Sequence, residues 1–166
     1  MKRKKMTLYN VIFPLWIVIF IPPIVFGVLL GNLVIDAAVI LLALRFAGWE
    51  LERPQLVVLV LKTWGLGFLA DIIGALVLIG LMATGWIEAW LDPMYLFSIW
   101  DSAAAVLTYL AVIALAGVII YWGNKRFAVA AGAPPEVAYK VALAMGIVTA
   151  PWTFLVPTAL FKGWLY

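Results

Sequence analysis

The chain alternates between long apolar runs and short polar breaks. A helix needs about 20 mostly apolar residues to cross about 30 Å of hydrocarbon at a rise of 1.5 Å per residue. Divided on this scale, the sequence predicts spans at residues 9–30, 32–48, 62–83, 102–122 and 139–161. The pattern therefore predicts an all-α protein that forms a single transmembrane bundle of about five spans.

Two places decide this span count. The apolar run from Tyr9 to Phe46 is almost twice as long as one span and contains Gly31-Asn32, a pair that favours a turn. A tight hairpin is expected there. Residues 84–101 are too short for a sixth span and are interrupted by Asp92-Pro93. We expect them to form an outer loop that lies on the membrane or re-enters it.

Composition supports a chain whose main solvent is lipid. Apolar residues make up 67% of the sequence and charged residues 11%, against about 45–50% and about 25% in soluble domains. The chain contains no Cys and no His, which excludes thiolate and imidazole chemistry and the usual zinc and haem sites. No metal and no cofactor are expected. The net charge of +3 does not indicate a nucleic-acid partner, because the basic residues lie beside apolar segments.

The distribution of basic residues predicts the orientation of the spans, because cytoplasmic loops are rich in Lys and Arg. With the N-terminus in the cytoplasm and the C-terminus outside, the outer side holds Lys162 alone. The inner side then holds all the others: Lys2, Arg3, Lys4, Lys5, Arg45, Arg53, Lys62, Lys125, Arg126 and Lys140. This bias predicts a multi-pass protein of a bacterial inner membrane or plasma membrane. Trp49, Trp64 and Trp122 are expected at the inner boundary.

Small residues indicate where helices pack, because close approach of backbones drives helix association in lipid. Gly27 and Gly31 form a GxxxG step, and Gly67 and Gly74 share one helix face. The last span carries a stripe that we expect to pack inside the bundle: Ala138, Ala142, Gly146 and Ala150. Pro151 and Pro157 should kink the same span.

Asp36 and Asp71 are acids inside predicted spans, where a charge costs at least about 2.5 to 3.5 kcal/mol. One interpretation pairs Asp71 with Arg45 as a structural ion pair. The other makes Asp36 and Asp71 a substrate or ion site that faces water, with Asn32 on the face of Asp36. The hairpin would place Asp36 near the outer surface, with Asn32, Thr153 or Thr158 as its neighbours. A solute would then lie between the segments 32–48, 62–83 and 139–161.

Aromatic residues and acids also gather in the predicted outer loop. Trp90 and Trp100 could bind a cationic or aromatic solute by stacking and cation–π attraction. An interfacial belt of aromatic residues explains the same positions and is the favoured interpretation.

Function is expected to be non-catalytic, since the sequence holds no phosphate-binding loop, dinucleotide fingerprint or metalloprotease motif. The first hypothesis is a membrane-embedded subunit or partner of a transport or envelope-assembly complex, whose partners are the lipid bilayer and other membrane subunits or further copies. The alternatives are a solute or ion transporter, or a substrate-binding membrane subunit of an importer, that uses Asp36 and Asp71, and a small lipid-modifying enzyme.

Overall fold

The described part of the chain is entirely helical. The computed structural model describes residues 24–84 and 99–156. Its helices are α2 (Ile24–Phe46), α3 (Arg53–Ala83), α5 (Ala103–Ala130) and α6 (Pro135–Val148), with short 3-10 helices η2 (Ile99–Asp101) and η3 (Trp152–Leu155). Four segments are long and apolar enough to cross a membrane: Val25–Phe46, Arg53–Leu81, Ala103–Ala130 and Pro135–Leu155. The predicted membrane-embedded helical bundle is therefore confirmed. Most of the predicted first span and most of the loop 84–101, with Trp90, lie outside the described residues.

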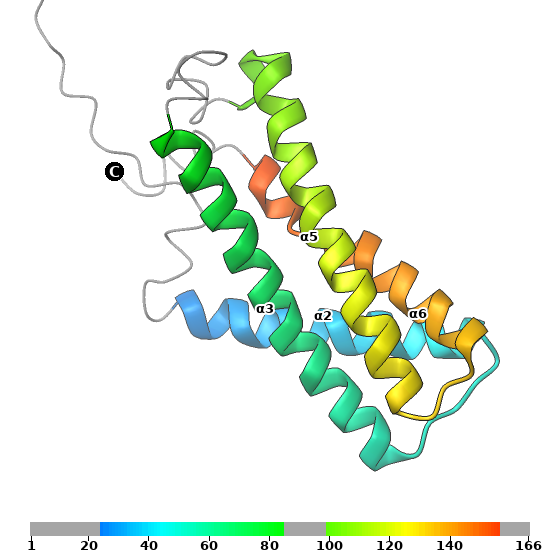
Figure 1. Cartoon of the computed structure of the whole chain (residues 1–166). Helices are drawn as coiled ribbons and strands as arrows, with labels where there is room; N and C mark the ends of the chain where they lie inside the picture. The colour runs from blue at the N-terminus through cyan, green and yellow to red at the C-terminus, as the bar shows by residue number, and fades with distance from the viewer. Residues whose placement is uncertain (1–23, 85–98, 157–166) are drawn as a thin grey trace, which may run out of the picture.

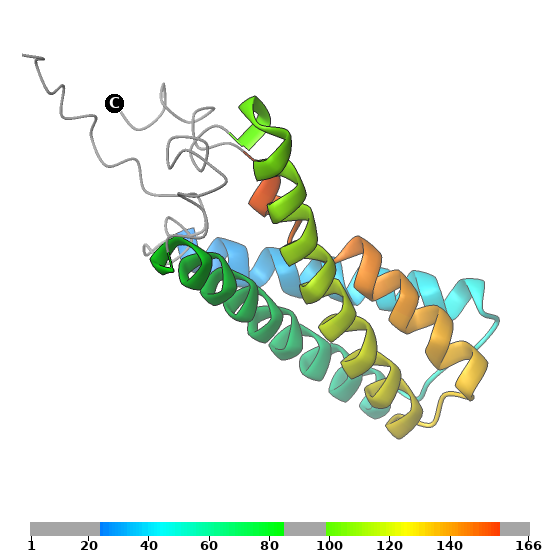
Figure 2. The same cartoon turned by 45° about the horizontal axis from the view of Figure 1, so that its top comes forward.

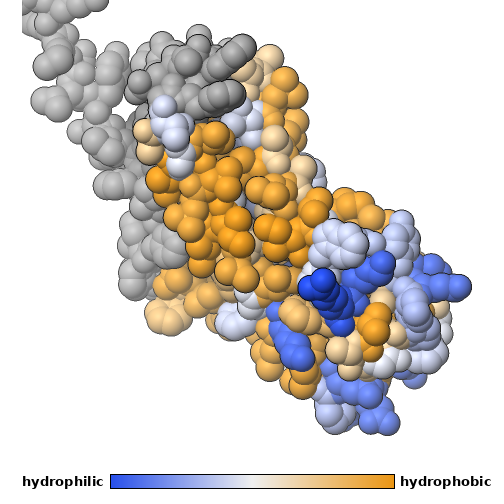
Figure 3. All heavy atoms as spheres, in the orientation of Figure 1, coloured by the Kyte–Doolittle hydropathy of each residue, from blue (hydrophilic) through white to orange (hydrophobic). Residues whose placement is uncertain are grey.

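The helices form a bundle that α2 crosses obliquely (Figures 1 and 2). α5 packs against both α3 and α6, and α2 contacts α6 and α3. The end of α2, the start of α3, the end of α5 and the start of α6 lie at one end of the bundle. Hydrophilic side chains gather at that end, whereas the visible face of the remaining bundle is mostly hydrophobic (Figure 3). One end of the bundle is thus distinctly more polar than its middle.

The hairpin predicted at Gly31-Asn32 is wrong. α2 runs without interruption from Ile24 to Phe46, and the described chain has positive φ only at Gly48 (67°) and Gly132 (94°), in the links that follow α2 and α5. A turn at Gly31 would leave backbone groups without partners in lipid, whereas a continuous helix satisfies them internally. Asp36 therefore lies well inside α2 and not near a helix end. It is about 18 Å from the start of the helix and about 15 Å from its end.

α3 is longer than the predicted span. It begins at Arg53 with Pro54 in its first turn, a position where a missing backbone N–H costs nothing. Residues 53–61, which lie before the predicted span 62–83, are therefore part of the same helix. Its 31 residues reach about 46 Å, and Trp64 lies about 17 Å inside its first residue.

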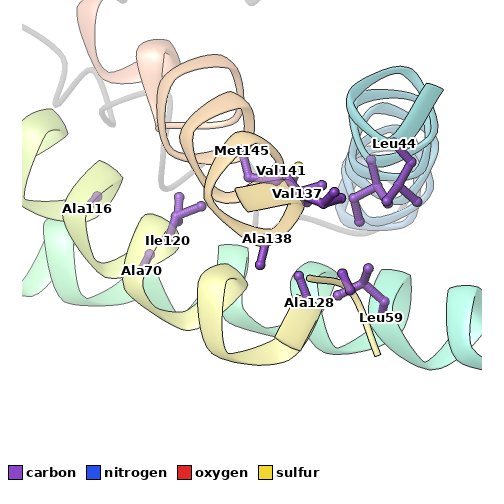
Figure 4. Close-up of a cluster of buried hydrophobic side chains, with 12 residues drawn as sticks. Leu44, Leu59, Ala70, Ala116, Ile120, Ala128, Val137, Ala138, Val141 and Met145 are labelled. Atoms are coloured by element: carbon purple, nitrogen blue, oxygen red, sulfur yellow. The ribbon is translucent and has the colours of Figure 1, made fainter. Parts of the chain in front are cut away.

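Two apolar clusters hold the helices together. The larger draws on all four long helices, with Leu44, Leu59, Ile120 and Val141 among its buried side chains (Figure 4). The second cluster joins α3 and α5 to η3 through Leu78, Ile113 and Phe154 among others. Between α3 and α5 lies a polar contact, in which the buried Thr63 hydroxyl donates to Oδ1 of Asn124 and Asn124 Nδ2 donates to the Ile120 carbonyl at 2.9 Å.

The small residues of α6 lie where this helix meets α5. Ala138, Ala142 and Ala150 are buried. A Cβ added to Gly146 would lie 2.8 Å from the carbonyl oxygen of Gly117, so the two backbones are almost in contact. On α3, a Cβ added to Gly74 would lie 2.9 Å from the ring of Phe154, so Gly74 makes room for η3. By contrast, a Cβ at Gly27 or Gly31 would meet no described atom within 4 Å.

Candidate functional site

A cavity of about 350 Å³ lies between α2, α3 and the segment that joins α6 to η3. Three of the predicted site residues, Asn32, Asp36 and Asp71, line it. Thr149 and Thr153 line it from the third side. The structure thus brings the two predicted acids to one cavity, between the three parts of the chain where a solute was expected.

Asp36 of α2 and Asp71 of α3 line the same cavity from neighbouring helices. The Asp36 side chain is only 6% exposed. Its Oδ2 lies 3.8 Å from the position that a Cβ on Gly67 would occupy. Asp71 follows Gly67 by four residues, and Cβ atoms at this spacing are about 5 to 6 Å apart on one helix face. Both acids therefore lie near Gly67, where α2 meets α3.

Neither carboxyl group has a protein partner within residues 24–84 and 99–156. No hydrogen bond and no ion pair to Asp36 or Asp71 is formed there. In particular, the predicted Arg45–Asp71 pair is not formed among these residues, because Arg45 is exposed in the last turn of α2. Arg45 lies nine residues beyond Asp36, about 13.5 Å along the helix, whereas Asp36 and Asp71 line one cavity. The acids face the cavity instead of a basic side chain.

The third wall of the cavity is a break in a membrane-spanning segment. α6 has 14 residues and extends about 21 Å, which is less than the hydrocarbon thickness of about 30 Å. The segment reaches the length of a span only with η3, after the bend at residues 149–151. Non-helical backbone at membrane depth occurs where it is buried in protein or lines a water-filled cavity. Residues 148–154 all line this cavity.

Side chains bond to backbone carbonyl groups near the point where α6 ends. Pro151 has no N–H to offer the Ile147 carbonyl four residues earlier. The indole N–H of Trp152 donates to that carbonyl instead, at 2.7 Å. The Thr149 hydroxyl donates to the Met145 carbonyl at 2.8 Å. The break at Pro151 is thus a stabilised structure that ends α6 beside the two acids.

Aromatic side chains form much of the remaining lining. Trp64 and Phe68 contribute from α3 with their rings edge to face and their centroids 5.3 Å apart, and Trp152 and Phe154 contribute from η3. The Trp64 indole N–H donates to the Leu29 carbonyl at 3.0 Å. The sequence interpretation missed this role of Trp64, which it assigned to the membrane boundary. The only signal for η3 was Pro151, which was expected to kink the span.

The aromatic residues predicted for an outer site do not join this cavity in the described chain. Trp100 is 62% exposed, and its indole N–H donates to the Leu155 carbonyl at 3.1 Å, which ties η2 to η3. Trp90 lies outside the described residues.

A second, larger hollow of about 610 Å³ follows the α5–α6 crossing. Its lining is almost wholly apolar and contains no charged residue; Gly117, Gly146, Tyr121 and Tyr139 contribute to it. Of these two hollows, the one with Asp36 and Asp71 is the one with carboxyl groups among its described lining residues.

No group of three or more His, Cys, Asp or Glu side chains suited to a metal ion occurs among residues 24–84 and 99–156. Comparison with known proteins finds no match: no protein-family model, curated protein or solved structure matches the chain.

Proposed function

We propose that the chain is a membrane protein that binds a cation in the cavity between α2, α3 and the α6–η3 break and carries it across the bilayer. The observation that supports this most is Asp36, a carboxyl group that is 6% exposed, lines the cavity and has no protein partner in the described chain. Ionisable residues inside a membrane that face a cavity are commonly parts of substrate or ion pathways. This is the transporter hypothesis of the sequence interpretation, now preferred to the subunit hypothesis.

Electrostatics gives the reason for a cation. Two carboxylates that line one cavity repel each other, and a medium of low dielectric strengthens the repulsion. A bound positive charge removes both the repulsion and much of the cost of burial. The broken helix supports the same function, because transporters often bind substrates and ions near the bilayer midplane where helices are discontinuous.

The orientation that we propose places the polar end of the bundle in the cytoplasm. This end carries the described basic residues beside α2, α3, α5 and α6: Arg45, Arg53, Lys62, Lys125, Arg126 and Lys140. Lys and Arg are retained on the cytoplasmic side of cell membranes. In this arrangement α2 runs from outside to inside, and the end of α3 and the start of α5 lie outside.

Transport by purified protein in liposomes tests the function. We would impose an inside-negative potential and measure uptake of rubidium and of methylammonium by the wild-type chain, Asp36→Asn and Asp71→Asn, with Glu50→Gln as a control acid outside the cavity. We expect uptake of at least one cation, which Asp36→Asn abolishes and Glu50→Gln leaves unchanged. Thermal unfolding in detergent is measured in parallel, because Asn keeps the shape of Asp. Loss of stability with unchanged uptake would make Asp36 a structural residue.

The second candidate is a membrane-embedded subunit of a larger complex. Gly27 and Gly31 favour it, because this GxxxG step faces no described atom within 4 Å and so leaves a close-approach surface on α2. Affinity capture in mild detergent tests it with Gly27→Leu and Gly31→Leu. The candidate requires a specific partner chain that the wild type retains and the variants lose. Recovery of the chain alone would exclude it.

A further inference from the structure

The lining of the cavity carries information on which cation it binds. We propose that the ligand is an organic ammonium ion, a protonated amine with a small apolar group, and not a bare metal ion. This inference rests on the proposed function and specifies its substrate class.

The carboxyl groups of the cavity favour a ligand that donates hydrogen bonds. Asp36 and Asp71 are acceptors when ionised. The indole N–H groups of Trp64 and Trp152, which would otherwise be donors, are bonded to the carbonyls of Leu29 and Ile147. The Thr149 hydroxyl donates to Met145. Asn32 and Thr153 also line the cavity, and their side chains can both donate and accept. The charged groups of the site are therefore the two acceptor carboxylates, and an ammonium group, which carries only donors, complements them.

The walls of the cavity favour a ligand with hydrocarbon. Four aromatic rings line it: Trp64, Phe68, Trp152 and Phe154. Because their N–H groups are occupied, the two Trp side chains can contact a ligand only through the carbon atoms of their rings. Aromatic faces attract ammonium cations, and they contact apolar groups well. A metal ion gains little from such walls, because Na⁺, Mg²⁺ and Ca²⁺ take oxygen ligands.

The size of the cavity points to the same class. Hard cations such as Ca²⁺ need six to eight oxygen ligands at 2.3 to 2.6 Å. Two carboxyl groups alone do not form such a cage, and the described residues contain no group of three or more His, Cys, Asp or Glu side chains suited to a metal ion. The cavity holds about 350 Å³, whereas one water fills about 30 Å³ of liquid. An amine of several carbon atoms fills this space better than a bare ion does.

The geometry also suggests how the ligand is oriented. The ammonium group lies at Asp36 and Asp71, where α2 meets α3. The apolar group lies against Phe68 and Phe154. Gly67 faces Asp36 with no side chain of its own, so this part of the cavity remains open to the ligand.

The test is calorimetric binding to the purified full-length chain in detergent. The probes are benzylammonium, its neutral analogue benzyl alcohol, and Na⁺ and Mg²⁺, all at one ionic strength. We expect saturable binding of benzylammonium and none of benzyl alcohol. Asp36→Asn should weaken binding about thirtyfold or more, because it removes a buried charge partner. Phe68→Leu should weaken it about two- to thirtyfold. Glu50→Gln, outside the cavity, should leave it unchanged.

A second variant covers the case in which Asp36→Asn fails to fold. Gly67→Leu keeps both acids and fills the space in front of Asp36, so it too should abolish binding. Asp36-dependent binding of Na⁺ or Mg²⁺ without binding of benzylammonium would overturn the amine and leave the proposed function intact. Equal binding of benzyl alcohol would also overturn the amine. Binding of no cation, with no cation uptake in liposomes, would overturn both proposals.

Discussion

Gly117 of α5 and Gly146 of α6 approach so closely that a Cβ on either would lie within 2.8 Å of the other's carbonyl oxygen. The contact is to backbone on both sides, so no side chain can move away to relieve it. We expect Gly146→Ala to lower the free energy of unfolding by about 1 to 3 kcal/mol, the usual cost of overpacking. Unfolding in detergent, followed by Trp fluorescence, measures it.

The matched control is Gly65→Ala. Gly65 lies inside α3, and a Cβ there would meet no described atom within 4 Å. Since Ala has the higher helix propensity, this variant should be neutral or more stable by up to about 1 kcal/mol. Equal behaviour of the two variants would show that α5 and α6 do not cross at these glycines.

Thr63 and Asn124 should behave as an energetically coupled pair. Both are almost fully buried, at 1% and 0% exposed, and each satisfies the other across the α3–α5 interface. In a double-mutant cycle with Thr63→Val and Asn124→Leu, we expect a coupling energy of about 0.6 to 1.7 kcal/mol, the range of interhelical hydrogen bonds in membranes. Thr108→Val is the control, because its hydroxyl donates to Ala104 within α5. Additive effects of the two substitutions would contradict the pairing.

The indole of Trp152 should matter only while residue 151 is a proline. Trp152→Phe removes the donor to the Ile147 carbonyl and should cost about 0.5 to 1.5 kcal/mol. Pro151→Ala restores a backbone N–H that can bond the same carbonyl. In that background Trp152→Phe should cost less. Thermal unfolding in detergent of the wild type, the two single variants and the double variant measures the difference. An equal cost in both backgrounds would contradict the idea that the indole N–H replaces the backbone N–H that proline lacks.

The orientation can be tested with single cysteines, because the natural chain contains none. Glu50→Cys lies in the link between α2 and α3, and Thr84→Cys follows the end of α3. In intact cells a membrane-impermeant maleimide should label Thr84→Cys and not Glu50→Cys, and it should label both after permeabilisation. The reverse pattern would invert the proposed orientation.

Hydropathy was sufficient to predict the helical membrane fold, because only helices satisfy their backbone within a segment in lipid. It did not predict the continuity of α2. Gly31-Asn32 favours a turn where water can solvate the backbone, and that preference does not transfer to a helix whose surroundings lack water. The start of α3 was placed too late for a related reason. A helix can extend beyond the hydrocarbon, so Trp64, read as a boundary marker, lies well inside α3.

The meeting of Asp36 and Asp71 depends on information that the sequence does not carry in any local pattern. Both acids were recognised because a charge inside an apolar segment has a high free-energy cost. Their meeting at one cavity depends on the oblique crossing of α2 over α3, which brings the Asp36 carboxyl group beside Gly67. Likewise, Pro151 indicated a kink, but only the tertiary structure shows that the interrupted segment forms a wall of the same cavity.

The continuity of α2 has a consequence for biogenesis. One Asp near the centre of a span adds about 2.5 to 3.5 kcal/mol to the apparent free energy of insertion, and each Leu, Ile, Val or Phe returns about 0.3 to 0.6 kcal/mol. Most other residues of α2 belong to these four types. The helix therefore has enough apolar residues to leave the translocon for lipid with its acid uncompensated. Integration of the nascent chain therefore does not depend on a salt bridge or a bound ligand. The Asp36 carboxyl group can remain without a partner until the mature protein binds the proposed ligand.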